Sequence, residues 1–271
     1  MREVLRRVTR VALIAMLPAA LLVGSAVDAR AQQPLASAPT AAEFFPRFDF
    51  ALAATALSYP DPRFSWDAHW IGDFDFFNYD GGRAQFLADY ETLLGSEFQP
   101  FDPYQSNYTL EASGSYFVGS TEFAAVLNHI SRHLGDRPKF QMVAENSLGV
   151  RVMRQVTSGS TTIDLRGDLR KIIEHAYVDY TWMTDLDVRV KQQIAPHIGV
   201  FAHVNGQVIP VDPAIAGRTA QYGGRAEAGL RLPGTKGTLE LYGGVERVID
   251  ADPLDRVTRR WPFVGFRLLR E

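Results

Sequence analysis

The fold is decided by residues 64–76, which read FSWDAHWIGDFDF. Every second residue from Phe64 to Phe76 is aromatic or small, whereas the residues between them include His69 and several aspartates. Successive side chains of a β-strand point to opposite faces. The stretch therefore predicts a strand with one apolar face and one charged face.

The same alternation recurs in residues 83–92, 108–118, 187–194 and 219–232. A soluble sheet would also alternate, but its polar face would lie in bulk water. Here the polar face carries charges of both signs in mid-strand, such as Arg225, Glu227 and Arg231, which suits a polar lumen where such charges pair. The apolar face is rich in aromatic and small residues, as a lipid-facing wall is. We therefore expect an all-β protein, a closed antiparallel transmembrane β-barrel of about twelve strands.

The predicted strands lie near 46–59, 63–79, 83–95, 105–118, 120–132, 139–156, 160–169, 172–183, 186–204, 217–232, 237–248 and 258–269. Tight connections are expected at 80–82, 119–120, 157–159, 184–185 and 233–236, and longer ones at 96–104, 133–138, 205–216 and 249–257. Outer-membrane barrels alternate short periplasmic turns with longer external loops. An even number of strands places both termini of the chain in the periplasm.

The N-terminal residues have the three parts of a secretory signal. Several arginines precede an apolar run, Val11–Val23, and Ala29-Arg30-Ala31 fits a cleavage site. We expect a signal peptide at 1–31, a flexible leader at 32–44 and the barrel at 45–271. The chain contains no cysteine, which is compatible with export through an oxidising compartment. The predicted location is the bacterial outer membrane.

The formal net charge is −3, and removal of the arginine-rich residues 1–31 makes it more negative. This sign argues against nucleic acid as a partner, and the expected partners are outer-membrane lipids. No phosphate loop or dinucleotide motif is present, so no cofactor is predicted. His69, His175, His197 and His203 lack metal-ligand spacing, so no metal site is predicted. We expect a solvated external loop that contains Asp250, Asp252 and Asp255.

The most unusual local sequence is NHISRHLGD, residues 128–136. A period of two places His129, Ser131 and His133 on one face at the end of one strand. Side chains two residues apart on a strand are roughly 6–7 Å apart, so His129 and Ser131 can meet with suitable rotamers. A serine beside an imidazole can act as nucleophile and base if a third group orients the imidazole.

The following strand offers two candidates for that third group. Asn146 lies on its apolar side and Glu145 on the other, and the sequence leaves both open. Function is open as well. The main hypothesis is a non-enzymatic barrel, structural or forming a narrow channel. The alternative is a hydrolase of membrane lipid built on His129 and Ser131, and a third class is a soluble periplasmic β-protein.

Residues 129–136, HISRHLGD, resemble the H-x-S-S-H-L-G-D signature of a bacterial family of unknown function that is regarded as outer-membrane-barrel-like. Residues 242–252 and 265–268 also resemble that family. More distantly, histidine-x-serine on a strand is similar to the catalytic pair of outer-membrane phospholipase A and lipid A deacylase barrels. That resemblance implies His129 as base, Ser131 as nucleophile, and Asn146 or Glu145 as the orienting group.

Overall fold

The computed structural model describes residues 33–135 and 141–270, and the predicted signal peptide lies outside them. The strands are β1 (Glu43–Leu57), β2 (Trp66–Tyr79), β3 (Gly82–Gly95), β4 (Asp102–Val118), β5 (Thr121–Leu134), β6 (Val143–Ser158), β7 (Thr161–Ala176), β8 (Trp182–Ala195), β9 (Ile198–Ile209), β10 (Gln221–Pro233), β11 (Thr238–Asp252) and β12 (Val257–Arg270). A four-residue helix, α2 (Pro213–Ala216), lies between β9 and β10. No helix in the described part of the chain is long and apolar enough to cross a membrane.

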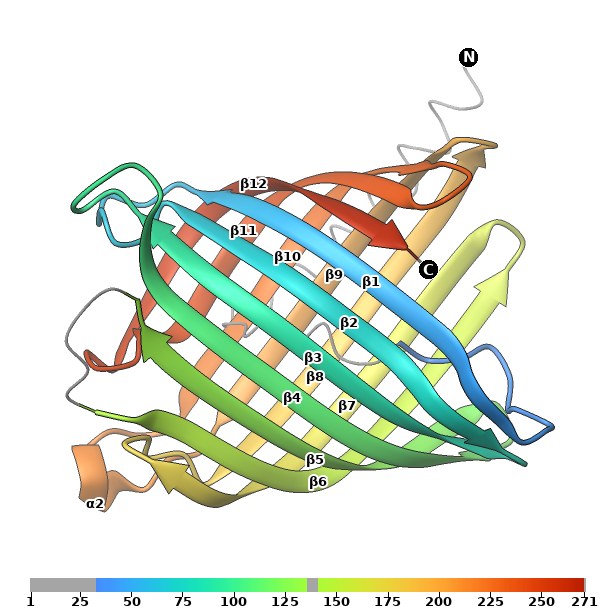
Figure 1. Cartoon of the computed structure of the whole chain (residues 1–271), viewed down its shortest axis with the longest axis horizontal. Helices are drawn as coiled ribbons and strands as arrows, with labels where there is room; N and C mark the ends of the chain where they lie inside the picture. The colour runs from blue at the N-terminus through green and yellow to red at the C-terminus, as the bar shows by residue number, and fades with distance from the viewer. Residues whose placement is uncertain (1–32, 136–140, 271) are drawn as a thin grey trace.

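The twelve strands form one closed antiparallel barrel in which each strand pairs with its neighbours in sequence and β12 pairs with β1 (Figure 1). The closing register aligns Ala54 with Phe266. Closure leaves no unpaired sheet edge, which is the condition for a sheet to cross a lipid bilayer. The predicted fold class is confirmed.

The short connections between strands lie at one end of the barrel and the long ones at the other (Figure 1). Short turns follow β2, β4, β6, β8 and β10, whereas α2 and the longer loops gather at the opposite end. Gly81 and Gly119 occupy two of the short turns with φ of 81° and 62°, a conformation that glycine adopts without steric cost. By the rule for such barrels, we refer to the loop end as external.

The predicted boundaries are wrong between β7 and β9. The break expected between the strands at 160–169 and 172–183 does not exist, because Arg170 continues the lumenal side of β7 after Asp168. The turn expected at 184–185 lies inside β8, where the buried Asp185 faces the lumen and pairs with Arg170. The real turn lies between Ala195 and Ile198, inside the single strand expected at 186–204. Lumenal charges resemble loop residues in the sequence, and this caused the errors.

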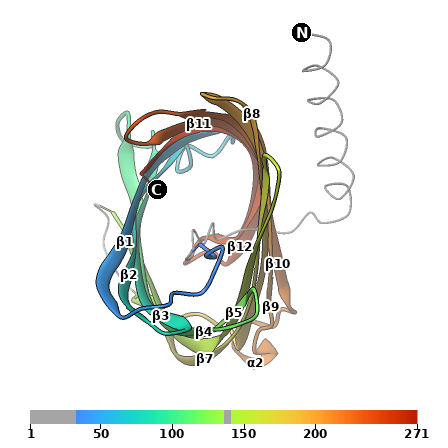
Figure 2. The same ribbon diagram turned by 90° about the vertical axis from the view of Figure 1, so that its right-hand side faces the viewer.

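The residues before β1 lie against the end of the barrel that carries the short turns. Figure 2 shows this segment turned into the barrel opening. Pro34 is buried, the Arg83 guanidinium donates to the Gln33 carbonyl over 2.7 Å, and the Gly81 amide donates to the Pro39 carbonyl over 2.9 Å. Residues 33–42 form no helix or strand.

The outer wall is apolar and carries aromatic side chains near both ends. Trp70, Tyr90 and Tyr108 form a row at the external end, with ring centroids 5.5 and 5.1 Å apart. Near the other end, the exposed Phe45 and Phe76 have ring centroids 5.4 Å apart. Aromatic girdles at two levels with aliphatic residues between them are typical of a wall that crosses a bilayer.

Ion pairs between buried side chains occupy much of the lumen. Arg267 donates to Glu240 and Glu227 over 2.8 Å each, and Arg83 donates to Glu122 over 2.7 Å. These side chains are buried. Hydrogen-bonded pairing of this kind is what makes buried charge tolerable.

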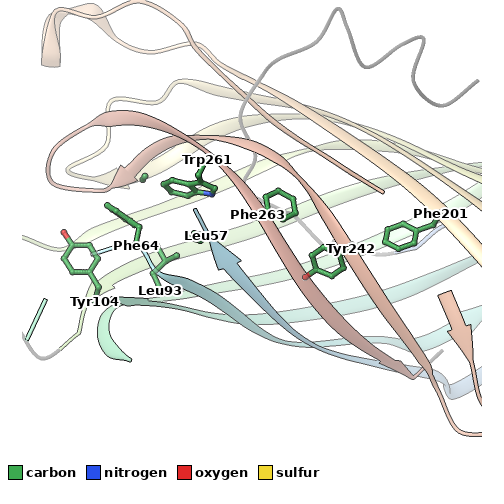
Figure 3. Close-up of a cluster of buried hydrophobic side chains, with 9 residues drawn as sticks. Leu57, Phe64, Leu93, Tyr104, Phe201, Tyr242, Trp261 and Phe263 are labelled. Carbon is green, nitrogen blue, oxygen red and sulfur yellow. The ribbon is translucent and has the colours of Figure 1, made fainter. Parts of the chain in front are cut away.

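Two apolar clusters close the external part of the lumen. The first surrounds Phe64, Tyr104 and Trp261, and Figure 3 shows these rings grouped near Leu57 and Leu93. The rings of Phe64 and Trp261 stack 5.5 Å apart. The second cluster contains Ile130, Val143, Ile172, Val178, Tyr180, Met183, Ile209 and Ile249. The mouth that faces the long loops is therefore closed by packed side chains.

Candidate functional site

The residues singled out by the sequence lie on the outer wall at the external end of β5 and β6. Phe123 and Leu127, earlier on the same side of β5, are 46% and 50% exposed, which identifies this side as lipid-facing. His129 and Ser131 continue that side, and His129 is directly opposite Asn146 of β6. Strand pairing thus brings together two of the predicted residues from positions 17 residues apart.

His129 and Asn146 form a hydrogen bond, with 2.8 Å between Nδ1 and Oδ1. The Asn146 amide nitrogen donates to Oε2 of Glu174 over 3.0 Å. Because that nitrogen is used by Glu174, the Asn146 oxygen faces His129 and must accept. His129 then carries its proton on Nδ1 and has a lone pair on Nε2, which is the tautomer that a general base needs.

A β-bulge in β7 places Glu174 on the outer wall. The register with β6 shifts between Asn146 and Ser147, whose partners are Glu174 and Ile172. The extra residue, Ile173, reverses the alternation, so that Ile172 points inward while Glu174 is exposed outside. Bulges often re-aim a side chain in this way. Sequence analysis did not predict Glu174 as the third member of this chain of hydrogen bonds.

Ser131 contacts a different histidine from the one expected. Its hydroxyl lies 3.3 Å from Nε2 of His133, and the structure shows no hydrogen bond between Ser131 and His129. The alternative orienting residue, Glu145, is 6% exposed and points into the lumen, on the other side of β6 from His129. The outer-wall group therefore consists of two hydrogen-bonded sets, His129-Asn146-Glu174 and Ser131-His133.

The level of this group in the wall follows from its neighbours. Ser131 is opposite Tyr108 of the external aromatic girdle, and the rings of Tyr108 and His133 lie 5.6 Å apart. Tyrosine and tryptophan girdles mark the headgroup level of a bilayer. The ester groups of membrane lipids lie at that level.

Of the three aspartates expected in a solvated external loop, Asp255 is exposed in a turn as expected, whereas the expectation is wrong for Asp250 and Asp252, which are buried in β11. Asp250 and Asp252 are each 3% exposed. The Arg218 guanidinium donates to both Asp250 oxygens over 2.7 Å and also binds Asp179. Burial alone would raise the pKa of Asp179, but the hydrogen bonds and charge of Arg218 outweigh it and hold that pKa below its usual value. These contacts fasten the external loops to one another.

A cluster of possible metal ligands lies in the lumen, although none was predicted. Single atoms of Asp67, His69 and Glu91 lie within 4.8 Å of one another. The sequence contained a usable signal: Asp67 and His69 share one side of a strand, and Glu91 shares the corresponding side of the next. Spacing along the chain could not reveal it, because the ligands meet only across strands.

The chain matches no protein-family description, and no curated protein matches it. Among solved structures it resembles an outer-membrane channel from Pseudomonas putida F1, with a TM-score of 0.51 and 12% identity over 90% of this chain and 99% of the channel. It also resembles the Salmonella typhi outer-membrane phospholipase dimer with bound calcium, with a TM-score of 0.50 and 13% identity over 84% of this chain and 91% of that one.

An active-site mutant of the Escherichia coli outer-membrane phospholipase A gives a TM-score of 0.50 with 12% identity, over 83% of this chain and 91% of that one. At these identities the likeness establishes the fold and no more. Fold, apolar outer wall and ionic lumen together define the chain as a β-barrel of the bacterial outer-membrane class.

Proposed function

We propose that this protein is a closed outer-membrane barrel of the structural or narrow-channel type. The observation that carries the proposal is the filled lumen, in which Arg83, Arg151 and Arg225 are almost completely buried. An open pore would leave such side chains in water. Outer-membrane lipids are its partners on the outer wall, since the apolar face of every strand is directed to them.

The ion pairs extend across strands and so narrow the passage. Arg189 of β8 reaches Glu240 of β11, passing over two intervening strands, and Glu240 also binds Arg231 and Arg267. Arg225 lies 4.0 Å over the Phe263 ring. A solute would have to break buried charge pairs to pass, which costs several kcal/mol for each.

The test is permeation by the full chain refolded into lipid vesicles. We expect no swelling of vesicles in solutions of disaccharide, and at most a small single-channel current from inorganic ions in planar bilayers. A Phe64→Ala/Trp261→Ala variant, which loosens the external aromatic cluster, should raise the ion current. Rapid uptake of disaccharide by the wild type would contradict the proposal.

A second candidate, an acyl hydrolase of membrane lipid, is favoured by the hydrogen bond between His129 and Asn146. The solved Salmonella protein is by name a phospholipase of the same fold. In this chain the Ser131 hydroxyl would attack the lipid ester, with the proton passing to an imidazole and then to the leaving alcohol. Water would then release the fatty acid. We include in this proposal that the chain is related to the family with the H-x-S-S-H-L-G-D signature.

Fatty-acid release from mixed phospholipid and lipid A in detergent distinguishes the two candidates. Ser131→Ala should abolish release. His129→Ala and His133→Ala identify the base, because only the base should lower the rate by a factor of about 10² or more. Thr157→Ala, at the opposite end of β6, is a matched control. Equal traces from wild type and Ser131→Ala would exclude the hydrolase.

We also propose the processing expected from the sequence, with residues 1–31 removed on export, 32–44 as a leader and 45–271 as the barrel. Intact-mass measurement of protein isolated from outer membranes tests this. The expected mature chain begins at Gln32. A mass that includes residues 1–31 would contradict it.

A further inference from the structure

Three neighbouring strands bring acidic, imidazole and amide side chains together in the external part of the lumen. Asp67 and His69 come from β2, and Asp89 and Glu91 from β3. Glu91 is directly opposite His69 on one side and Asn107 of β4 on the other. All three strands present these residues inward, so the row His69-Glu91-Asn107 crosses the inner wall.

His69 is held between two carboxylates. Its Nδ1 lies 3.0 Å from Oδ2 of Asp89, and its Nε2 lies 3.0 Å from Oδ1 of Asp67. When Asp89 accepts the proton on Nδ1, the Nε2 lone pair points towards Asp67. A carboxylate that fixes the far nitrogen of a histidine in this way is the usual support of a metal-binding histidine.

The surrounding cavity offers further oxygens and measures about 70 Å³. Asn107 Oδ1, Glu145 Oε2 and Gln207 Oε1 line it, are buried, and accept no hydrogen bond from any described residue. Their residues are 5%, 6% and 2% exposed. Asn107 cannot be turned round, because its amide nitrogen donates to Glu91 over 3.0 Å. All three atoms are acceptors, which a cation or its bound water satisfies.

The charge at this place differs from that of the rest of the lumen. Several other lumenal carboxylates are bound to arginine, as Glu111 is to Arg151 at 2.6 Å and Asp185 is to Arg170 at 2.7 Å. Here Asp67 and Asp89 each lie 3.0 Å from a ring nitrogen of His69. A neutral His69, which is the form that has a lone pair on Nε2, adds no positive charge beside Asp67, Asp89 and Glu91, so a bound cation is favourable next to these carboxylates.

We propose that this cluster binds one divalent transition-metal ion, with Asp67, Glu91 and Nε2 of His69 as ligands and Asp89 as the residue that orients His69. The donor set contains nitrogen and oxygen. It suits Zn²⁺ or Mn²⁺ better than Ca²⁺, which takes oxygen ligands. The site joins β2 to β3 beneath the external aromatic cluster and so stabilises the closed barrel.

The test uses the full chain, refolded in detergent, stripped with a chelator and dialysed against Zn²⁺, Mn²⁺ or Ca²⁺. We expect about one Zn²⁺ or Mn²⁺ per chain by elemental analysis, little Ca²⁺, and a rise in unfolding temperature with the bound metal. Co²⁺ should give a visible absorption spectrum with a bound nitrogen ligand. Wild type that retains no more metal than a blank would overturn the proposal.

The variants are His69→Asn, Glu91→Gln and the milder Asp89→Asn. Asp89→Asn should weaken Zn²⁺ binding about 10–100-fold, and His69→Asn and Glu91→Gln, which remove direct ligands, should weaken it more. The matched control is Asp164→Asn, which removes a lumenal carboxylate that is bound to Lys191. This variant should bind Zn²⁺ with wild-type affinity. The heat-dependent mobility of the barrel on gels shows which variants fold. Folded variants with wild-type affinity, or an equal loss in the Asp164→Asn control, would refute the assignment.

Discussion

Arg151 of β6 reaches past β5 and binds Glu111 of β4 with both terminal nitrogens, at 2.6 and 2.8 Å. Its Nε donates to Asp168 of β7 over 2.7 Å. One side chain thus ties together strands on both sides of its own. Because Arg151 is 1% exposed, this contact belongs to the interior of the barrel and shows how the lumen is filled.

Removal of this arginine is predicted to destabilise the barrel strongly. Arg151→Ala leaves Glu111 and Asp168 buried without their main cation, and breaking a buried pair from one side costs about 3–5 kcal/mol. Urea titration of the protein in lipid vesicles measures the loss. The control is Arg154→Ala on the exposed side of the same strand, which should change stability by less than about 1 kcal/mol. Equal effects of the two variants would contradict the assignment of Arg151 to a buried lumen.

A charge placed on the outer wall should cost free energy that depends on its depth. Val150 lies in the middle of β6 and is 57% exposed. Val150→Arg is predicted to lower the free energy of unfolding of the barrel in vesicles by about 2–4 kcal/mol. Val156→Arg, near the short turn on the same side of the strand, should cost about 0–1 kcal/mol. Equal costs at the two depths would mean that this wall does not cross the bilayer.

The fastening of the external loops should fail in acid. Arg218 holds the pKa of Asp179 below its usual value even though burial opposes this, and an ordinary aspartate has a pKa of about 3.9. The ion pair therefore stabilises the loops above about pH 4 and is lost as the pH falls below it. A spin label on cysteine at Ile215 of α2 should become mobile only in acid, and in an Arg218→Gln variant it should be mobile at every pH. If the mobility of the label did not change with pH in the protein that retains Arg218, the prediction would be contradicted.

The period of two predicted the fold because it fixes which side of each strand meets lipid, whatever the details of packing. It predicted the outer-wall position of His129 and Asn146 for the same reason. It failed wherever a position depended on contacts between strands. The bulge at Ile173, which places Glu174 beside Asn146, has no signature in the local sequence. The pairing of Ser131 with His133 depends on rotamers.

The boundaries of β7 to β9 failed for a related physical reason. Arg170 and Asp185 resemble loop residues in the sequence, but they pair with each other inside the lumen at 2.7 Å, so the strands continue through them. Pro196 was the overlooked signal, because proline cannot donate to a strand ladder and often marks its end. Charge is a poor sign of a loop when the interior is itself ionic.

The central claim is that neighbouring side chains alternate between hydrocarbon and a filled interior. Single cysteines at positions 123–127 of β5 test it most directly, since the chain has no cysteine of its own. Spin labels on Phe123, Ala125 and Leu127 should be relaxed by oxygen dissolved in the bilayer, and labels on Ala124 and Val126 should be protected. If oxygen relaxed the labels at all five positions equally, or if its effect varied along the chain with the period of a helix, the barrel described here would be contradicted.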